Sequence, residues 1–129
     1  MMTELQIVQK YLKVPYKSEG KDMKGMNCWE LVKSVYRDLG KPLEDLVEYA
    51  EKCPIGEQAR LAESYKDSVV KVSSPQSFDI VLMEFDGNLH AGIVLSKSRF
   101  FHTCRSGTGV CRLNDHFWWK RILGYYRAR

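Results

Sequence analysis

The sequence predicts an α+β domain in which helices come first and an antiparallel sheet follows. Before residue 40, apolar residues recur at three- and four-residue steps, which is the spacing of one helix face. After residue 75, short apolar segments are separated by turn residues such as Asp86-Gly87-Asn88, a pattern typical of an antiparallel meander. A chain of 129 residues is long enough for one domain, 1–129, with a substantial core.

The first predicted helix covers the opening residues, MMTELQIVQKYLKV, and ends before Pro15, because a proline disfavours helical geometry in the residue before it. We expect its buried stripe to comprise Leu5, Val8 and Leu12, with Ile7 and Tyr11 beside them. The segment has no seven-residue apolar core and no small-residue cleavage site. We therefore expect an amphipathic helix and not a signal peptide.

The second predicted helix begins at Cys28 and ends at Gly40, a residue type common after helix C-termini. Asn27 is a suitable N-cap, and Glu30 occupies the reciprocal position of a capping box. At the first helical position, unpaired backbone N–H groups and the helix dipole favour the thiolate form of Cys28. The same helix face carries Leu31, Val32 and Val35. The thiol should therefore point inward, whereas Glu30, about 200° round the helix, should point away. A small buried structural cysteine is the competing interpretation.

The remaining elements are a helical insertion and a sheet of about five strands. The insertion, 43–68, carries no motif that we tie to chemistry. Strands are predicted at 78–83, 89–95, 99–104, 109–113 and 122–127. The first of these is almost continuously apolar, so we expect it to be buried on both faces.

Two histidines lie on neighbouring predicted strands. With a turn at 96–98, residue 90 pairs roughly with 103 or 104, so His102 is about diagonal to His90 and both can face the same side. We predict that His90 is the base for Cys28 and that His102 accepts the second ring N–H of His90 and fixes its tautomer. Metal binding by Cys28, His90 and His102 is the competing functional interpretation, and it lacks the acidic or further thiol ligands that usually complete such a site.

The other cysteines, the third histidine and the net charge carry weaker signals. No cysteine lies in a C-x-x-C pair, so a zinc ribbon is not predicted. Cys104 and Cys111 can face each other across a hairpin, but we expect thiols in a chain made in the cytosol. His116, in the aromatic cluster 114–119, is interpreted as structural or surface. The net charge of +4 indicates a solvated surface, with an anionic polymer such as nucleic acid or cell wall as a minor alternative partner.

In this order, the motifs resemble those of the NlpC-type cell-wall cysteine peptidases, which belong to the papain-like α+β class. The matching segments are Pro15-Tyr16, the GMNCWELV segment at 25–32, Phe78-Asp79-Ile80-Val81, His90-Ala91-Gly92-Ile93 and Phe101-His102. The resemblance implies Cys28 as nucleophile, with His90 and His102 completing a triad. It also implies that Tyr16, Asn27 and Trp29 bind the oxyanion or the substrate. Asn27 replaces the family's usual Asp, and Glu30 replaces its usual Gly, which leaves substrate choice open.

The resemblance implies a substrate, a location and partners. The substrate would be the peptidoglycan stem peptide, cut between D-glutamate and the diamino acid, with no cofactor, nucleic acid or membrane span involved. The Cys28-Trp29 pair, the insertion at 43–68 and the ending at 118–127 are similar to bacteriophage tail-assembly and tail-tip peptidases. That subgroup implies a virion protein, made in the host cytoplasm without a signal peptide, that acts in the periplasm or cell wall with phage tail proteins as partners.

Three alternatives remain open at the level of the sequence. The chain could be a structural tail-assembly protein that keeps the fold with little activity. It could be a thiol amidase or acyltransferase that acts on another amide. It could also be a plain binding module.

Overall fold

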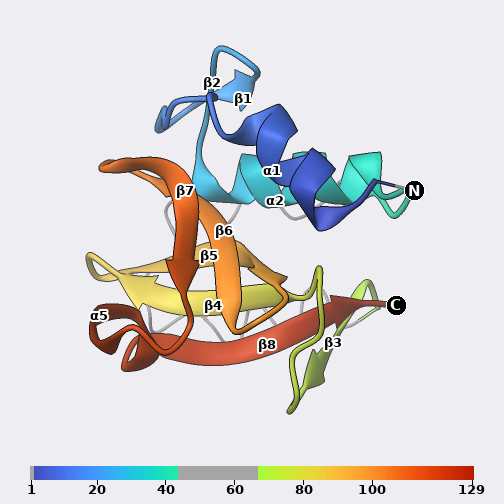
Figure 1. Cartoon of the computed structure of the whole chain (residues 1–129), viewed down its shortest axis with the longest axis vertical. Coiled ribbons are helices and arrows are strands. Elements are labelled where there is room, and N and C mark those ends of the chain that lie inside the picture. The colour runs from blue at the N-terminus through green and yellow to red at the C-terminus, as the bar shows by residue number, and fades with distance from the viewer. Residues whose placement is uncertain (1, 44–66) are drawn as a thin grey trace.

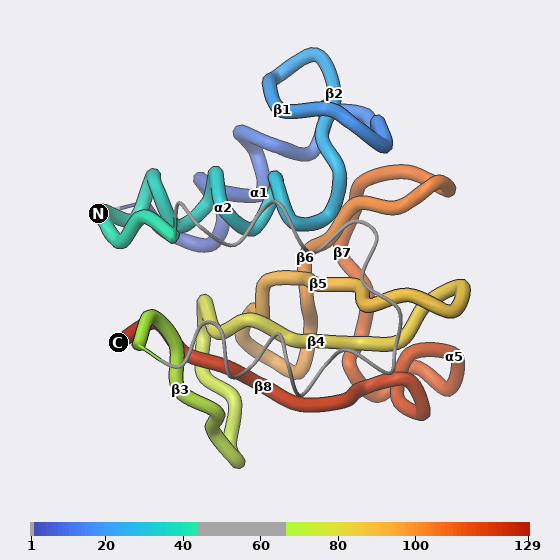
Figure 2. The backbone as a smooth tube through the Cα atoms, turned by 180° about the vertical axis from the view of Figure 1, so that it is seen from behind, coloured from blue at the N-terminus to red at the C-terminus, as the bar shows by residue number. Residues whose placement is uncertain are grey.

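Two helices and a small hairpin form one layer of the structure, and a six-stranded antiparallel sheet forms the other (Figure 1). The computed structural model describes residues 2–43 and 67–129. The view from behind in Figure 2 shows the helices above the sheet, with β6 and β7 turning up toward the helical layer. This architecture confirms the predicted α+β class. The predicted insertion at 43–68 lies almost entirely outside the described residues.

Helix α1 (Glu4–Tyr11) buries only part of the predicted stripe. Its fully buried apolar residues are Ile7 and Tyr11, whereas Leu5 and Leu12 are 65% and 46% exposed. The prediction of Leu5 and Leu12 as core residues is therefore wrong. The sheet-facing stripe includes Glu4, whose charge interrupts the apolar period in the sequence.

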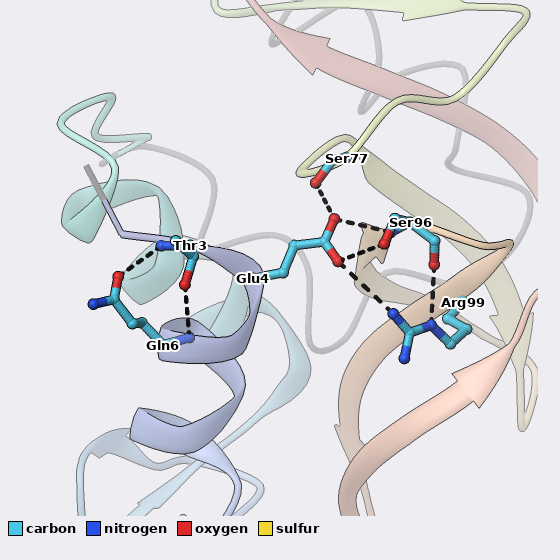
Figure 3. Close-up of polar contacts among 6 residues, drawn as sticks. All are labelled: Thr3, Glu4, Gln6, Ser77, Ser96 and Arg99. Carbon is cyan, nitrogen blue, oxygen red and sulfur yellow. Dashed lines mark hydrogen bonds and ion pairs between the residues drawn. The ribbon is translucent and has the colours of Figure 1, made fainter.

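Glu4 belongs to that stripe because its carboxylate is hydrogen-bonded to the sheet, as Figure 3 shows. It accepts bonds from the Ser96 N–H at 2.9 Å, the Ser96 hydroxyl at 3.0 Å and the Ser77 hydroxyl. The Arg99 guanidinium lies 3.9 Å away. We call Glu4, Ser77, Ser96 and Arg99 the Glu4 clamp. It ties the first turn of α1 to the turn between β5 and β6 and to the segment before β4.

Helix α2 (Cys28–Asp38) confirms the predicted start and end of the second helix. Asn27 is the N-cap, and its side chain accepts the Glu30 N–H at 2.8 Å. After the C-terminal end, Gly40 has a φ of +75°, a left-handed conformation that glycine adopts without steric cost. The helix packs on β5 and β6 and shares the larger core cluster with α1.

The strands confirm the predicted meander and add one strand to it. Their bounds are β3 (Val69–Val72), β4 (Ile80–Phe85), β5 (Asn88–Leu95), β6 (Arg99–Cys104), β7 (Gly107–Arg112) and β8 (Ile122–Ala128). All pairs are antiparallel, in the order β3-β8-β4-β5-β6-β7. Strand β3 was not predicted, because it is short and contains a lysine. A short helix, α5 (His116–Trp119), precedes β8, and a two-residue hairpin, β1 (Lys21–Asp22) with β2 (Gly25–Met26), precedes α2.

Strand β4 is buried on both faces, as its continuous apolar sequence predicts. Ile80 and Leu82 belong to the core cluster beneath the helices. Val81 and Met83 belong to a second cluster on the opposite face, together with Trp118. This second cluster supplies the apolar surroundings of the site described below.

The residues just before β4 anchor the start of this strand, away from the site described below. Asp79 is buried, and the Arg127 guanidinium from β8 donates two hydrogen bonds to its carboxylate, at 2.8 and 2.9 Å. Phe78 has a φ of +72°, which is strained for a residue with a side chain. The Tyr36 hydroxyl donates to the Phe78 carbonyl.

In the part of the chain that the structure describes, no helix has the length and apolar character needed to cross a membrane.

Candidate active site

A cleft of about 150 Å³ opens where α2 and β5 begin and β6 ends. Its lining residues are Tyr16, Ser18, Asn27, Cys28, Phe85, Asp86, Asn88, Leu89, His90, Cys104 and Arg105. Four residues predicted for the site therefore share one cleft: Tyr16, Asn27, Cys28 and His90. The charged side chains in the lining, Asp86 and Arg105, come from the β4–β5 and β6–β7 turns.

Cys28 stands at the first position of α2, where its sequence context predicts it. Its side chain is 7% exposed and lies in the cleft lining. The Asn27 cap holds this helix start from two sides, since its amide also donates to the Ser18 carbonyl at 3.1 Å. The N-terminus of a helix presents backbone N–H groups and partial positive charge, which favours a negative sulfur or oxygen nearby.

Tyr16 reaches the cleft through a short bridge beside the helix start. It pairs with Met26 in a parallel bridge, supported by bonds from Lys17 N to Met26 O at 2.9 Å and from Met26 N to Pro15 O at 3.0 Å. The loop closes tightly at Gly20, where a Cβ would lie only 2.1 Å from the Gly25 oxygen. Only glycine fits at position 20, and this explains the glycine-containing loop before the cysteine.

His90 and His102 form a direct pair, as the strand register predicts. Strand β5 pairs with β6 so that Ile93 lies opposite Phe101, and the same register places His90 opposite Cys104 and diagonal to His102. His90 Nε2 lies 2.8 Å from His102 Nδ1. Gly92 leaves room for this contact, since a Cβ there would approach the His102 Cβ to 3.3 Å. His102 is not part of the cleft lining and stands behind His90.

The histidine pair lies in an aromatic cage that the sequence did not predict. Trp118 from α5 stacks on His90, with ring centroids 5.7 Å apart and planes 20° apart, and meets His102 edge-on at 4.9 Å. Phe85 and Phe100 close the cage. The Trp118-Trp119 pair in the sequence indicated an aromatic cluster, but no pattern in the sequence indicated which strands it packs against.

Burial in this cage keeps both imidazoles neutral near pH 7. Desolvation, and secondarily the charge of the neighbouring His102, lower the pKa of His90 to about 3. Desolvation lowers the pKa of His102 to about 4. A neutral imidazole carries one N–H and one lone pair. Each ring can therefore donate one hydrogen bond and accept another, and His90 can act as a base.

The cysteines of β6 and β7 do not face each other. Cys104 pairs with Gly107, and Cys111 pairs with Phe100. Their alternative pairing across the hairpin is thus wrong, because the turn is tighter than expected. The Cys104 sulfur lies 3.0 Å from the Ser106 hydroxyl, and the Cys111 sulfur lies 3.4 Å from His102 Nε2. Cys28, Cys104 and Cys111 are not in disulfide bonds, as expected.

Two predicted neighbours of Cys28 are buried rather than open to the cleft. Trp29 is 3% exposed in the helix-side core, so its role in oxyanion or substrate binding stays a prediction. Glu30 is 4% exposed, with the Lys33 ammonium 3.9 Å from its carboxylate. That Glu30 points away from Cys28 stays a prediction, and its side chain is buried because the whole first turn of α2 is covered. His116 is exposed at the start of α5, consistent with a surface role.

Comparisons with known proteins bear on residues 13–127, which match the sequence model of the NlpC/P60 family. No curated protein matches the chain. A Staphylococcus aureus structure, described as similar to a lipoprotein of the NLP/P60 family, superposes with a TM-score of 0.70 at 21% identity, over 95% of this chain and 39% of that one. A Bacillus cereus NlpC/P60 family protein gives 0.66 at 18% identity, over 91% and 36%.

The NlpC/p60 domain of the peptidoglycan hydrolase SagA gives a TM-score of 0.62 at 19% identity, over 95% of this chain and 94% of that one. At these identities the three structures establish the fold alone. The chain spans less than half of the first two proteins but nearly all of the SagA domain. The expected papain-like architecture is confirmed.

Proposed function

Because the chain belongs to the NlpC/P60 family, we propose that it is a cysteine peptidase of the bacterial cell wall. In this proposal Cys28 is the nucleophile, His90 the general base and His102 the residue that orients His90. The observation that carries the proposal is that Cys28 and His90 line one cleft while His90 Nε2 is hydrogen-bonded to His102 Nδ1. That bond leaves His90 Nδ1 as the ring nitrogen for the thiol proton.

The reaction would proceed by acyl transfer. The Cys28 sulfur attacks the peptide carbonyl carbon as its proton passes to His90, and a tetrahedral oxyanion forms. Collapse of this species breaks the C–N bond, and His90 returns the proton to the leaving amine. Water, deprotonated by His90, then hydrolyses the thioester and restores the thiol. The backbone N–H groups at the start of α2, the Tyr16 hydroxyl and Asn27 are the proposed stabilisers of the oxyanion.

The proposed substrate is the peptidoglycan stem peptide, at the bond between D-glutamate and the diamino acid. The fold shared with the NlpC/p60 domain of a peptidoglycan hydrolase supports a cell-wall substrate. The cleft turns offer charges of both signs, from Asp86 and Arg105, to a peptide that carries carboxylates and amines. A role in a phage tail, with tail proteins as partners, rests on the Cys28-Trp29 pair and the ending at 118–127.

The test is mass spectrometry of purified wall fragments incubated with the protein and, in parallel, with Cys28→Ala. We expect new amine and carboxylate ends with the wild-type protein only, and the masses of the products name the bond. Unchanged fragments, with Cys28 shown to be intact and reduced, would favour the structural tail protein. Release of ammonia or transfer to an added amine would favour an amidase or acyltransferase.

A further inference from the structure

The hydrogen bond between the two histidines can run in either direction, but the proposed Cys28–His90 chemistry requires that His90 is the donor. Both rings are neutral, and either can donate across the 2.8 Å contact between His90 Nε2 and His102 Nδ1. If His90 donates, its Nδ1 keeps a lone pair and can accept the Cys28 proton. If His102 donates, His90 carries its hydrogen on Nδ1 and has no lone pair for that proton. An acidic partner in place of His102 would fix the direction, because an ionised carboxylate only accepts.

A group that contacts the far nitrogen of His102 can favour one direction of donation over the other. When His90 donates to Nδ1, the hydrogen of His102 is on Nε2, which lies in a side chain only 3% exposed. A buried N–H without an acceptor is costly, more so than an unused lone pair. The Cys111 sulfur lies 3.4 Å from this Nε2. Among the described residues, it is the partner that the structure gives to this nitrogen, and it can accept the N–H of this tautomer.

We propose that Cys111 is a positioning residue whose sulfur accepts the His102 Nε2–H and so stabilises the tautomers in which His90 keeps a lone pair on Nδ1. The inference rests on the proposed function only for its effect on hydrolysis. Burial raises the pKa of Cys111 and keeps it a neutral thiol, and the lone pairs of its sulfur can accept the N–H of this tautomer. Trp118, whose indole N–H can only donate, packs in the same cluster as Cys111.

The position of Cys111 on β7 supports a built arrangement. It lies opposite Phe100 in the register, on the same face as His102 and Trp118. The chain of contacts runs from the cleft at His90, through His102, to Cys111 near the surface of the sheet. Without the sulfur, the His102 N–H is left unpaired, and the reversed direction of donation becomes favoured.

The first test reads the tautomers directly, without any substrate. The chain has three histidines, so long-range proton–nitrogen correlation spectra of protein with labelled histidine contain three ring patterns. His116→Gln and His102→Gln each remove one pattern and thereby assign them. We expect the Nε2–H form for both His90 and His102 in the wild-type protein at neutral pH. Cys111→Ala should shift His102 toward the Nδ1–H form, and Cys111→Ser, whose hydroxyl still accepts, should restore the wild-type pattern.

The second test measures hydrolysis of the wall fragments. Cys111→Ala should lower kcat about tenfold with KM little changed, and Cys111→Ser should recover most of the loss. Val110→Ala is the matched control, because Val110 is the preceding residue of β7, points to the other face and is 40% exposed. It should leave both spectra and kcat unchanged.

An Nδ1–H tautomer for His102 in the wild-type protein would overturn the proposal, as would spectra and kcat that Cys111→Ala leaves unchanged. If Cys111→Ala does not fold, the wild-type tautomer and the Cys111→Ser variant decide the matter. A wild-type protein that cleaves no wall fragment would count against the peptidase function, while the tautomer result would still judge Cys111.

Discussion

The two ends of the β5–β6 hairpin hold polar clusters of opposite character. At the turn, the Glu4 carboxylate is partly exposed, charged and bonded to Ser77 and Ser96 (Figure 3). At the open end, His90 and His102 are buried in an aromatic cage and are neutral. One cluster fastens a helix to the sheet, whereas the other contains the base of the proposed peptidase. Solvent and charge partners make the difference, since the two clusters share the same strands.

The largest expected effect separates the two histidines of the open end. His90→Ala removes the base and the acid for the leaving amine, so hydrolysis should fall about 10²–10⁴-fold. His102→Gln, which keeps an acceptor for His90, should retain measurable activity, and His102→Ala should lose more. Steady-state kinetics on wall fragments, with circular dichroism to check folding, measure this order. Equal activity of His102→Ala and wild-type protein would remove His102 from the site.

The two ends should lose stability in different pH windows. The folded-state pKa values of His90 and His102 lie below the ordinary 6.5, so the unfolded chain binds protons that the folded protein does not. Their contribution to stability is full above pH 6.5 and is lost as the pH falls toward 4 and 3. Partial burial alone would raise the pKa of Glu4, but hydrogen bonds from Ser77 and Ser96 outweigh it and lower the pKa below 4.5. The contribution of Glu4 is therefore lost only below that pH.

Urea unfolding as a function of pH measures both windows. His102→Gln should flatten the dependence between pH 6.5 and 4, and Glu4→Gln should flatten it below pH 4.5. If Glu4→Gln instead flattened the pH dependence of the unfolding free energy between pH 6.5 and 4, the two clusters would not be independent.

A smaller effect is expected from Glu4→Gln at neutral pH. The neutral amide weakens bonds to two serines and the attraction to Arg99, so the free energy of unfolding should fall by about 1–2 kcal/mol. Hydrolysis should be unchanged, because the clamp lies at the far end of the strands. Glu19→Gln, the same change at an exposed position, is the control for stability. Loss of activity at unchanged stability would contradict the division between the two ends.

The smallest effect is expected next to the clamp, at Phe78. Its positive φ costs about 1–2 kcal/mol for a residue with a Cβ, and glycine relieves this strain. Phe78→Gly also loses packing against the core, so the net change in the free energy of unfolding should be below about 1 kcal/mol. Phe101→Ala, at a fully buried position without a strained φ, should cost about 3–5 kcal/mol. Similar losses in the two variants, measured by urea unfolding, would argue against strain at Phe78.

Local patterns predicted most of the geometry of the candidate site. Asn27 and Cys28 follow capping rules that act within one turn of helix, and the histidine pair follows from one turn length and the period of a strand. Trp118 and Cys111 could not be predicted in this way. They meet His102 only because β7 and α5 fold over the same face, which no short-range pattern specifies.

The same limit explains the error in α1. The period of the sequence selected Leu5 and Leu12, since both are apolar at suitable spacing. The partners of Glu4 lie 73 and 92 residues away in the chain, so its place on the buried stripe is set by tertiary contacts alone. The prediction of the α+β class was nevertheless correct, because it depends on the order of the elements and not on which helix face is buried.

The position of β8 between β3 and β4 has a consequence for how the chain folds. Strands β4 to β7 are joined by short turns, so they can pair while they are being synthesised, and the histidine register comes with them. Until residues 122–128 arrive, β4 has an unpaired edge along one of the most apolar segments of the chain. Such an edge is a template for pairing with other chains. We therefore expect self-association to compete with folding during synthesis, and the late insertion of β8 to be the step that ends this competition.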